Sequence, residues 1–144
     1  MKALSVLLLA LVAVGCHFDK LFNDSSGGAA ARAAPPTATH LIFITEPHNT
    51  PAGTIITPPV RVAAVDDQDQ IVTGFSGTIS IAIGRNGSLL NPHLSGTTND
   101  VPVVNGVATF PDLSIDQPGI DYTLVAHTAG PWSVESATFN VGLP

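Results

Sequence analysis

Cysteine is almost absent from this chain of 144 residues, and that absence limits how a fold can be held together. Cys16 is the only cysteine. Without a second one no intramolecular disulfide can form, so a folded domain must depend on its apolar core. A free thiol is also a liability in an oxidising compartment, and modification of Cys16 would remove that liability.

Positive charge is scarce as well. The chain has five Lys and Arg against eleven Asp and Glu, which gives a formal net charge of −6. Lys2 precedes Cys16 and every acidic residue follows it, so the part that begins at Cys16 has a balance of four basic against eleven acidic residues. Proteins that bind nucleic acid normally cluster Lys and Arg. The composition excludes that class and fits a secreted or surface protein that must stay soluble.

The N-terminus has the architecture of a signal peptide. Met1-Lys2-Ala3 supplies a positive start, and residues 4–14 form an apolar run that only Ser5 interrupts. This run is too short to be a comfortable transmembrane span. Residues 1–15 are therefore predicted to be a signal peptide that is removed from the mature protein.

The end of this segment, Ala13-Val14-Gly15-Cys16, resembles the lipobox of bacterial lipoproteins. The resemblance implies that Cys16 is lipidated and becomes the mature N-terminus, where several acyl chains give stable membrane anchoring. The alternative is a plain secretory signal with an incidental cysteine. Because His17 rather than Asp follows, the resemblance points to the outer membrane of the cell envelope, with the domain facing the periplasm or the surface.

Residues 16–39 have the composition of a linker. The stretch is rich in small and polar residues, contains prolines and has no sustained hydrophobic period. Such a segment cannot bury enough apolar area to offset the entropy of ordering it. We expect a flexible, disordered tether that holds the next domain away from the membrane.

From His40 onward the pattern changes to period two, which predicts β-strands. No helical period occurs, so residues 40–144 are expected to form one all-β domain, an antiparallel β-sandwich of about seven strands. Leu89, Leu90 and Leu94 are expected to anchor a long polar loop to the core. The main strands are expected at residues 40–46, 60–66, 75–83, 101–104, 107–110, 121–128 and 136–141.

Two local motifs refine this fold. Asn105-Gly106 between apolar runs predicts a type I′ hairpin turn, in which both central residues need positive φ. The stretch from Gly119 to Leu124 resembles a tyrosine corner, in which the hydroxyl of Tyr122 would bond back to the backbone of the preceding corner. The role of Tyr122 would then be structural.

Residues 41–141 as a whole resemble the bacterial Ig-like repeats of the Big/invasin type. The resemblance implies an immunoglobulin-like sandwich and a role as spacer, stalk or adhesive module, without catalysis. The matching segments are Ala52-Gly53, Pro58-Pro59-Val60-Arg61-Val62, Val72-Thr73-Gly74-Phe75-Ser76-Gly77, Leu94-Ser95-Gly96-Thr97, Asn105-Gly106-Val107-Ala108-Thr109-Phe110, Leu113-Ser114-Ile115, Gly119-Ile120-Asp121-Tyr122-Thr123-Leu124 and Ser136-Ala137-Thr138-Phe139-Asn140-Val141.

The sequence has no recognisable catalytic motif. It contains no Gly-x-Ser-x-Gly elbow and no paired-histidine metal spacing, and His40, His48, His93 and His127 are scattered over strand ends and loops. We therefore predict no enzyme activity and no cofactor. Asp66-Asp67-Gln68-Asp69 has two interpretations, a calcium loop or a β-turn with solvated carboxylates, and it lacks the glycine and the distal glutamate of an EF-hand.

Trp132 is the one candidate contact residue for a ligand or partner. It follows Pro131 in a loop, where it either caps the core or stacks on a ligand. The leading hypothesis is a membrane-anchored surface lipoprotein whose domain has a structural, adhesive or protein-interaction role. The alternative is a module that binds a glycan or another envelope ligand through Trp132 and the loops around Asp69 or Asn91. An exposed Trp132 beside other aromatic residues would favour the alternative.

Overall fold

A computed structural model describes residues 34–144 of the chain. The predicted signal peptide, Cys16 and most of the predicted tether lie outside the described residues. Packing of the domain begins shortly before the first strand. Ala38 is buried, and the Thr39 backbone N–H donates a hydrogen bond of 2.8 Å to the carbonyl of Val65.

The described residues form an all-β structure. Among them there is no helix of the length and apolarity needed to cross a membrane. The strands are β1 (His40–Thr45), β2 (Thr50–Pro51), β3 (Val60–Val65), β4 (Thr78–Ile83), β5 (Leu94–Ser95), β6 (Val101–Pro102), β7 (Val107–Phe110), β8 (Ser114–Ile115), β9 (Gly119–Tyr122), β10 (Leu124–Thr128), β11 (Ser133–Glu135) and β12 (Phe139–Gly142).

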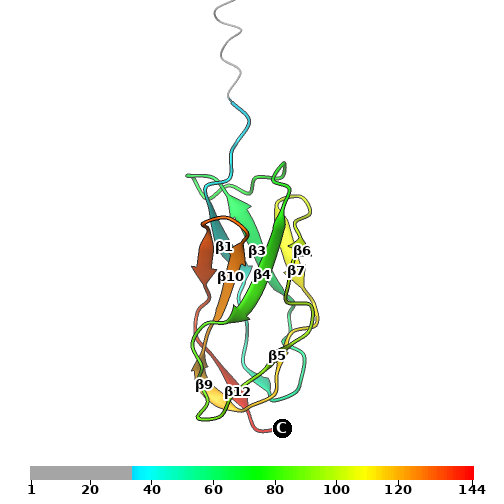
Figure 1. Ribbon diagram of the computed structural model, residues 1–144, viewed down its shortest axis with the longest axis vertical. Coiled ribbons are helices and arrows are strands. Elements are labelled where there is room, and N and C mark those ends of the chain that lie inside the picture. The colour runs from blue at the N-terminus through cyan, green and yellow to red at the C-terminus, as the bar shows by residue number, and fades with distance from the viewer. Residues whose placement is uncertain (1–33) are drawn as a thin grey trace, which may run out of the picture. The chain divides into compact units, whose positions relative to one another are not determined.

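Two principal sheets give the domain a sandwich-like arrangement. One has the order β1-β3-β7 and the other the order β11-β10-β4-β6, and all of their ladders are antiparallel. Figure 1 shows β4 and β10 side by side, in front of β1 and β3. A smaller sheet, β2-β12-β9, lies at the end of the domain opposite to His40, and there β12 and β2 pair in parallel.

The core lies between these sheets. The alternation predicted for the β4 region is confirmed, since Ile79 and Ile81 are buried and Ile83 packs against the core. The strand is shorter than predicted, however, because it begins at Thr78 and leaves Phe75 and Gly77 outside the ladder. The largest fully buried side chains are Tyr122, Phe110, Ile56, Ile79, Leu113, Ile115, Leu124, Val60, Val62 and Val65.

One strand that the sequence predicted as continuous changes partners halfway, and another begins later than predicted. The predicted strand 121–128 is divided into β9, which pairs with β12, and β10, which pairs with β4 and β11. At the division the Thr123 hydroxyl accepts a 2.6 Å hydrogen bond from the Arg85 N–H and donates one of 2.5 Å to Glu135. The predicted strand 136–141 is likewise wrong at its start, because Ala137 is exposed and the structure has a separate β11 before it.

The prediction that Leu89 and Leu90 anchor their loop is also wrong. Their exposed fractions are 106% and 59%, whereas Leu94 pairs with Ile115 and packs against the core. Polar bonds order this loop instead. Asn86 Oδ1 accepts from the Ser88 N–H at 2.8 Å, and Ser88 Oγ accepts from the Leu90 N–H at 3.1 Å.

The hairpin turn at Asn105-Gly106 is confirmed. Asn105 has a φ of 50° and Gly106 a φ of 79°, which is the pair of positive values that the turn type requires. The flanking residues Val104 and Val107 exchange two backbone hydrogen bonds of 2.9 and 3.0 Å.

Candidate functional site

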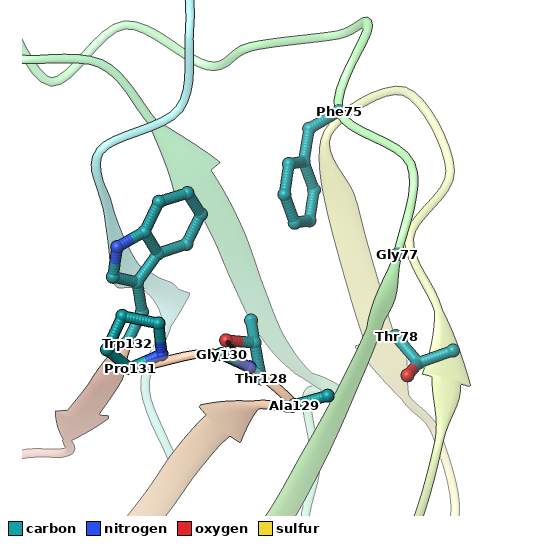
Figure 2. Close-up of a pocket in the computed structure, with 8 residues that line it drawn as sticks. All are labelled: Phe75, Gly77, Thr78, Thr128, Ala129, Gly130, Pro131 and Trp132. Carbon is teal, nitrogen blue, oxygen red and sulfur yellow. Dashed lines mark hydrogen bonds between the residues drawn. The ribbon is translucent and has the colours of Figure 1, made fainter.

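An apolar hollow lies where the approach to β4 meets the loop between β10 and β11. It has a volume of about 440 Å³, and Figure 2 shows its side chains. The rings of Phe75 and Trp132 stand on its two sides, and Pro131 lies beside Trp132. We call this feature the aromatic hollow; its lining consists of Phe75, Gly77, Thr78, Thr128, Ala129, Gly130, Pro131 and Trp132.

Backbone hydrogen bonds hold the Phe75 side of the hollow. The Phe75 N–H donates to the Val72 carbonyl at 3.0 Å, and the Gly77 carbonyl accepts from Val103 at 2.9 Å. The ring of Phe75 folds back over Gly77, where a Cβ would stand only 3.1 Å from the ring carbon Cζ. A side chain at position 77 would therefore push the ring out of its place.

The Trp132 side is held by the loop that joins β10 to β11. The Thr128 N–H donates to the carbonyl of Trp132 at 3.1 Å, and the Gly130 N–H donates to the Thr128 hydroxyl at 3.2 Å. The Phe75 and Trp132 ring centroids are 5.8 Å apart, and the rings are tilted by 39°. Both side chains are half-buried and pack against the core, so the site is preformed and still open to solvent.

The polar groups of the hollow are few and uncharged. The Thr78 hydroxyl donates to Asp100 at 3.3 Å. The Thr128 hydroxyl oxygen accepts from Gly130, which leaves its own proton available for another acceptor. The indole nitrogen of Trp132 lies on the side of its ring away from Phe75 (Figure 2).

Trp132 is neither fully buried nor fully exposed. Its ring packs against the core, and it also lines an open hollow beside a second aromatic residue. Sequence reasoning missed Phe75 as a site residue. Its place in the alternating pattern marked it only as a core position, and 56 residues separate it from Trp132 in the sequence.

Asp69 and Asn91, the loop residues considered together with Trp132, do not line the hollow. Asp69 Oδ1 lies 2.9 Å from His40 Nε2 in an exposed pair. Pro92 and His93, which follow Asn91, line a different hollow beside Ile83, at the opposite end of β4 from Thr78. The geometry thus separates Asn91 from Trp132.

The Asp66-Asp69 segment forms a turn. Asp66 Oδ1 accepts hydrogen bonds from the Gln68 N–H at 2.9 Å and the Gln70 N–H at 3.0 Å. Asp69 has a positive φ of 58°, and its N–H donates to the Asp66 carbonyl at 3.1 Å. Residues 34–144 contain no group of three or more His, Cys, Asp or Glu side chains placed to hold a metal ion.

The four candidate histidines lie on different elements. His40 begins β1 and bonds Asp69, and His48 Nδ1 lies 2.9 Å from the Glu46 carbonyl in the next loop. His93 follows the Leu89-Leu90 loop, and His127 is an exposed residue of β10. The structure does not bring any of them into the aromatic hollow.

Tyr122 is fully buried, and its hydroxyl donates a 3.0 Å hydrogen bond to the carbonyl of Gln117. This is the backbone contact that the tyrosine-corner interpretation requires. Burial raises the pKa of Tyr122 above its usual value, since the charged phenolate loses its hydration.

Asp112 lies in the loop before β8, and its carboxylate accepts hydrogen bonds from the Thr97 N–H at 2.9 Å and the Thr97 hydroxyl at 2.8 Å. These bonds lower the pKa of Asp112.

Comparisons with known proteins add no family assignment. No protein-family model matches the chain, and no curated protein matches it. The functional argument therefore depends on the site geometry and on the N-terminal sequence.

Proposed function

We propose that this protein is a lipid-anchored component of the bacterial cell envelope whose Ig-like domain binds a partner through the aromatic hollow. The observation that carries the binding role is the Phe75-Trp132 pair. Two half-buried aromatic rings line a preformed, open, uncharged hollow of a size suited to a ligand group. The anchor is Cys16, on the strength of the lipobox-like sequence that ends there.

Strand order supports the Ig-like assignment. β1, β3 and β7 are neighbours in the way that strands A, B and E are in an immunoglobulin sheet, and β11, β10 and β4 correspond to G, F and C. Tyr122, whose hydroxyl bonds Gln117, lies just before β10, the strand that corresponds to F. A tyrosine corner occupies this place in immunoglobulin folds. These features favour an adhesive or interaction module.

Binding of a glycan is the weaker alternative. Aromatic rings stack on sugars, and Trp132 offers such a surface. A sugar also presents many hydroxyl groups, and each of them needs a polar partner when it leaves water. The lining of the hollow offers few polar side-chain groups, namely Thr78, Thr128 and the Trp132 indole N–H.

One experiment separates anchoring from binding. The full chain and the variants Cys16→Ser and Trp132→Ala are produced in a bacterial host, followed by membrane fractionation and crosslinking to envelope components. Cys16→Ser should leave the membrane fraction, because acyl chains supply the anchoring energy, and should still crosslink its partner. Trp132→Ala should stay in the membrane and lose the partner.

Two controls make the result decisive. Ser26→Ala, in the predicted tether, should change neither readout, and thermal unfolding of Trp132→Ala should show that the domain still folds. Membrane retention and lipid labelling of Cys16→Ser would refute the anchor. Unchanged crosslinking by a folded Trp132→Ala would refute the binding role.

A further inference from the structure

We infer that the aromatic hollow binds an extended, proline-rich segment of a partner protein, held by the rings of Phe75 and Trp132 and by hydrogen bonds to its backbone carbonyls. The inference rests on the proposed function, because it names the ligand class of the same site. It follows from the charge, the donor groups and the shape of the hollow.

Charge restricts the occupant first. None of the residues that line the hollow is charged, so a charged group entering it would lose water without gaining a partner. The nearby carboxylate is Asp100, which the Thr78 hydroxyl bonds. Residues 34–144 have two arginines against nine carboxylates, and this excess of negative charge disfavours phosphate, sulfate or acidic-sugar ligands.

The polar groups of the hollow restrict the chemistry of the occupant further. The Thr128 hydroxyl accepts from Gly130 and keeps its own proton for an acceptor at the hollow, while the indole N–H of Trp132 lies at the outer edge of its ring, where it can reach a chain that passes over the margin. A site of donors and aromatic faces is complementary to a ligand of acceptors and apolar rings. Proline residues have this chemistry, since each keeps its carbonyl acceptor and has no N–H that would need a partner.

Shape points to the same occupant. The hollow is open, with exposed Gly77, Gly130 and Pro131 at its margin, so a chain can pass over it. Proline-rich segments adopt the polyproline II helix, which has no internal hydrogen bonds and loses little entropy on docking into aromatic-lined grooves. The site is rigid as well, because backbone bonds hold both walls. Low ordering costs on both sides permit binding through a small surface.

The test uses the full chain in lipid nanodiscs, titrated with a proline-rich peptide, an alanine-rich peptide of equal length and a neutral oligosaccharide. Trp132 is the only tryptophan, so the intrinsic fluorescence of the protein reports on the hollow itself. The proline-rich peptide should produce a saturable change, and the alanine-rich peptide, which has carbonyls but no pyrrolidine rings, should not.

Variants then assign the contacts, with affinities measured by calorimetry. Trp132→Phe keeps an aromatic face and removes the N–H, and Thr128→Val removes the hydroxyl; each should weaken peptide binding roughly two- to tenfold, the value of one hydrogen bond. Thr128→Ser should restore the affinity. Leu89→Ser, which removes an exposed apolar side chain outside the hollow, should leave it unchanged.

The outcomes distinguish this inference from the proposed function. Saturable binding of the oligosaccharide without binding of the proline-rich peptide would overturn the ligand class and leave the binding role intact. The same conclusion holds if neither ligand binds and Trp132→Ala still loses its crosslinked partner. If neither ligand binds and a folded Trp132→Ala keeps its partner, both are overturned.

Discussion

At the scale of single residues, Tyr122 combines a buried phenol ring with a hydrogen bond to the backbone five residues earlier. Its ring centroid lies 6.0 Å from that of Phe139, and its hydroxyl bonds Gln117 at 3.0 Å. The charged phenolate would lose its hydration in this buried position, so the folded domain favours the neutral phenol. Burial therefore raises the pKa of Tyr122 in the folded state above that in the unfolded chain.

Tyr122→Phe tests this residue through stability and pH. At neutral pH the change should lower the free energy of unfolding by about 1–2 kcal/mol, since the Gln117 carbonyl loses its donor. Above the unfolded pKa of about 10, ionisation stabilises the unfolded wild-type chain, so wild-type stability falls as pH rises toward the folded pKa. The difference in the free energy of unfolding between wild type and Tyr122→Phe should therefore become smaller above that pH. Urea denaturation at each pH measures this difference.

A spectroscopic control accompanies this experiment. Tyr122 is the only tyrosine, so tyrosinate absorbance during an alkaline titration reports on it alone. A titration midpoint at or below that of the urea-unfolded chain would contradict the burial argument.

Residue roles were partly predictable from local pattern. The alternation along residues 75–83 placed Ile79 and Ile81 in the core, because a strand presents every second side chain to the same face. Hydrophobicity alone failed for Leu89 and Leu90, which an ordered polar loop holds in solvent. Phe75 became a site residue only because folding brings Trp132 against it.

At the scale of elements, the turn between β6 and β7 shows how one position restricts the residue it accepts. Gly106 has a φ of 79°, and a Cβ there would stand 2.6 Å from Ile71 Cγ2 and 2.7 Å from the Val72 carbonyl oxygen. The turn thus packs against the segment that follows the Asp66-Asp69 turn. The Gly106 carbonyl also accepts a 2.9 Å hydrogen bond from the Ala64 N–H.

Gly106→Ala should therefore lower the free energy of unfolding by about 2–4 kcal/mol, from backbone strain together with the steric clash. Chemical denaturation measures the change. Gly74→Ala is the matched control: no atom lies within 4 Å of its added Cβ, and the change should stay within about 0.5 kcal/mol. Equal stability of the two variants would show that the turn tolerates a side chain.

Element boundaries were predicted less well than element positions. Period-two patterns found the longer strands among the twelve, but they could not reveal that β9 and β10 pair with different partners. That change depends on the bonds of Thr123 to Arg85 and Glu135, which are distant in sequence. β11 was missed because Ser133-Val134-Glu135 is too short for alternation to be visible, and its pairing with β10 defines it.

At the scale of the whole molecule, the described domain has an excess of negative charge that its own contacts do not neutralise. Among residues 34–144 neither arginine pairs with a carboxylate, and the exposed contact between His40 and Asp69 is an ion pair only when the histidine carries a proton. Nine carboxylates face two arginines in that range. Repulsion among unpaired carboxylates lowers the stability of a compact state.

Raising sodium chloride from about 0.01 M to about 0.15 M should therefore raise the thermal unfolding midpoint, since the Debye length falls from about 30 Å to about 8 Å. Differential scanning calorimetry at pH 7 measures the shift. Chloride is preferable to sulfate, because sulfate also stabilises proteins by exclusion from their surface. A midpoint that falls with added chloride would show that attractive pairs dominate.

The sequence by itself determined the class of this protein's fold, because period-two hydrophobicity and turn residues act between neighbours in the chain. It also determined that the one thiol precedes the domain, so that no disulfide contributes to stability. Only the tertiary structure decided where the candidate site lies. Phe75 and Trp132 meet through the pairing of β4 with β10, which no local pattern encodes. Non-local contacts of this kind form when strands distant in sequence bury their apolar faces together.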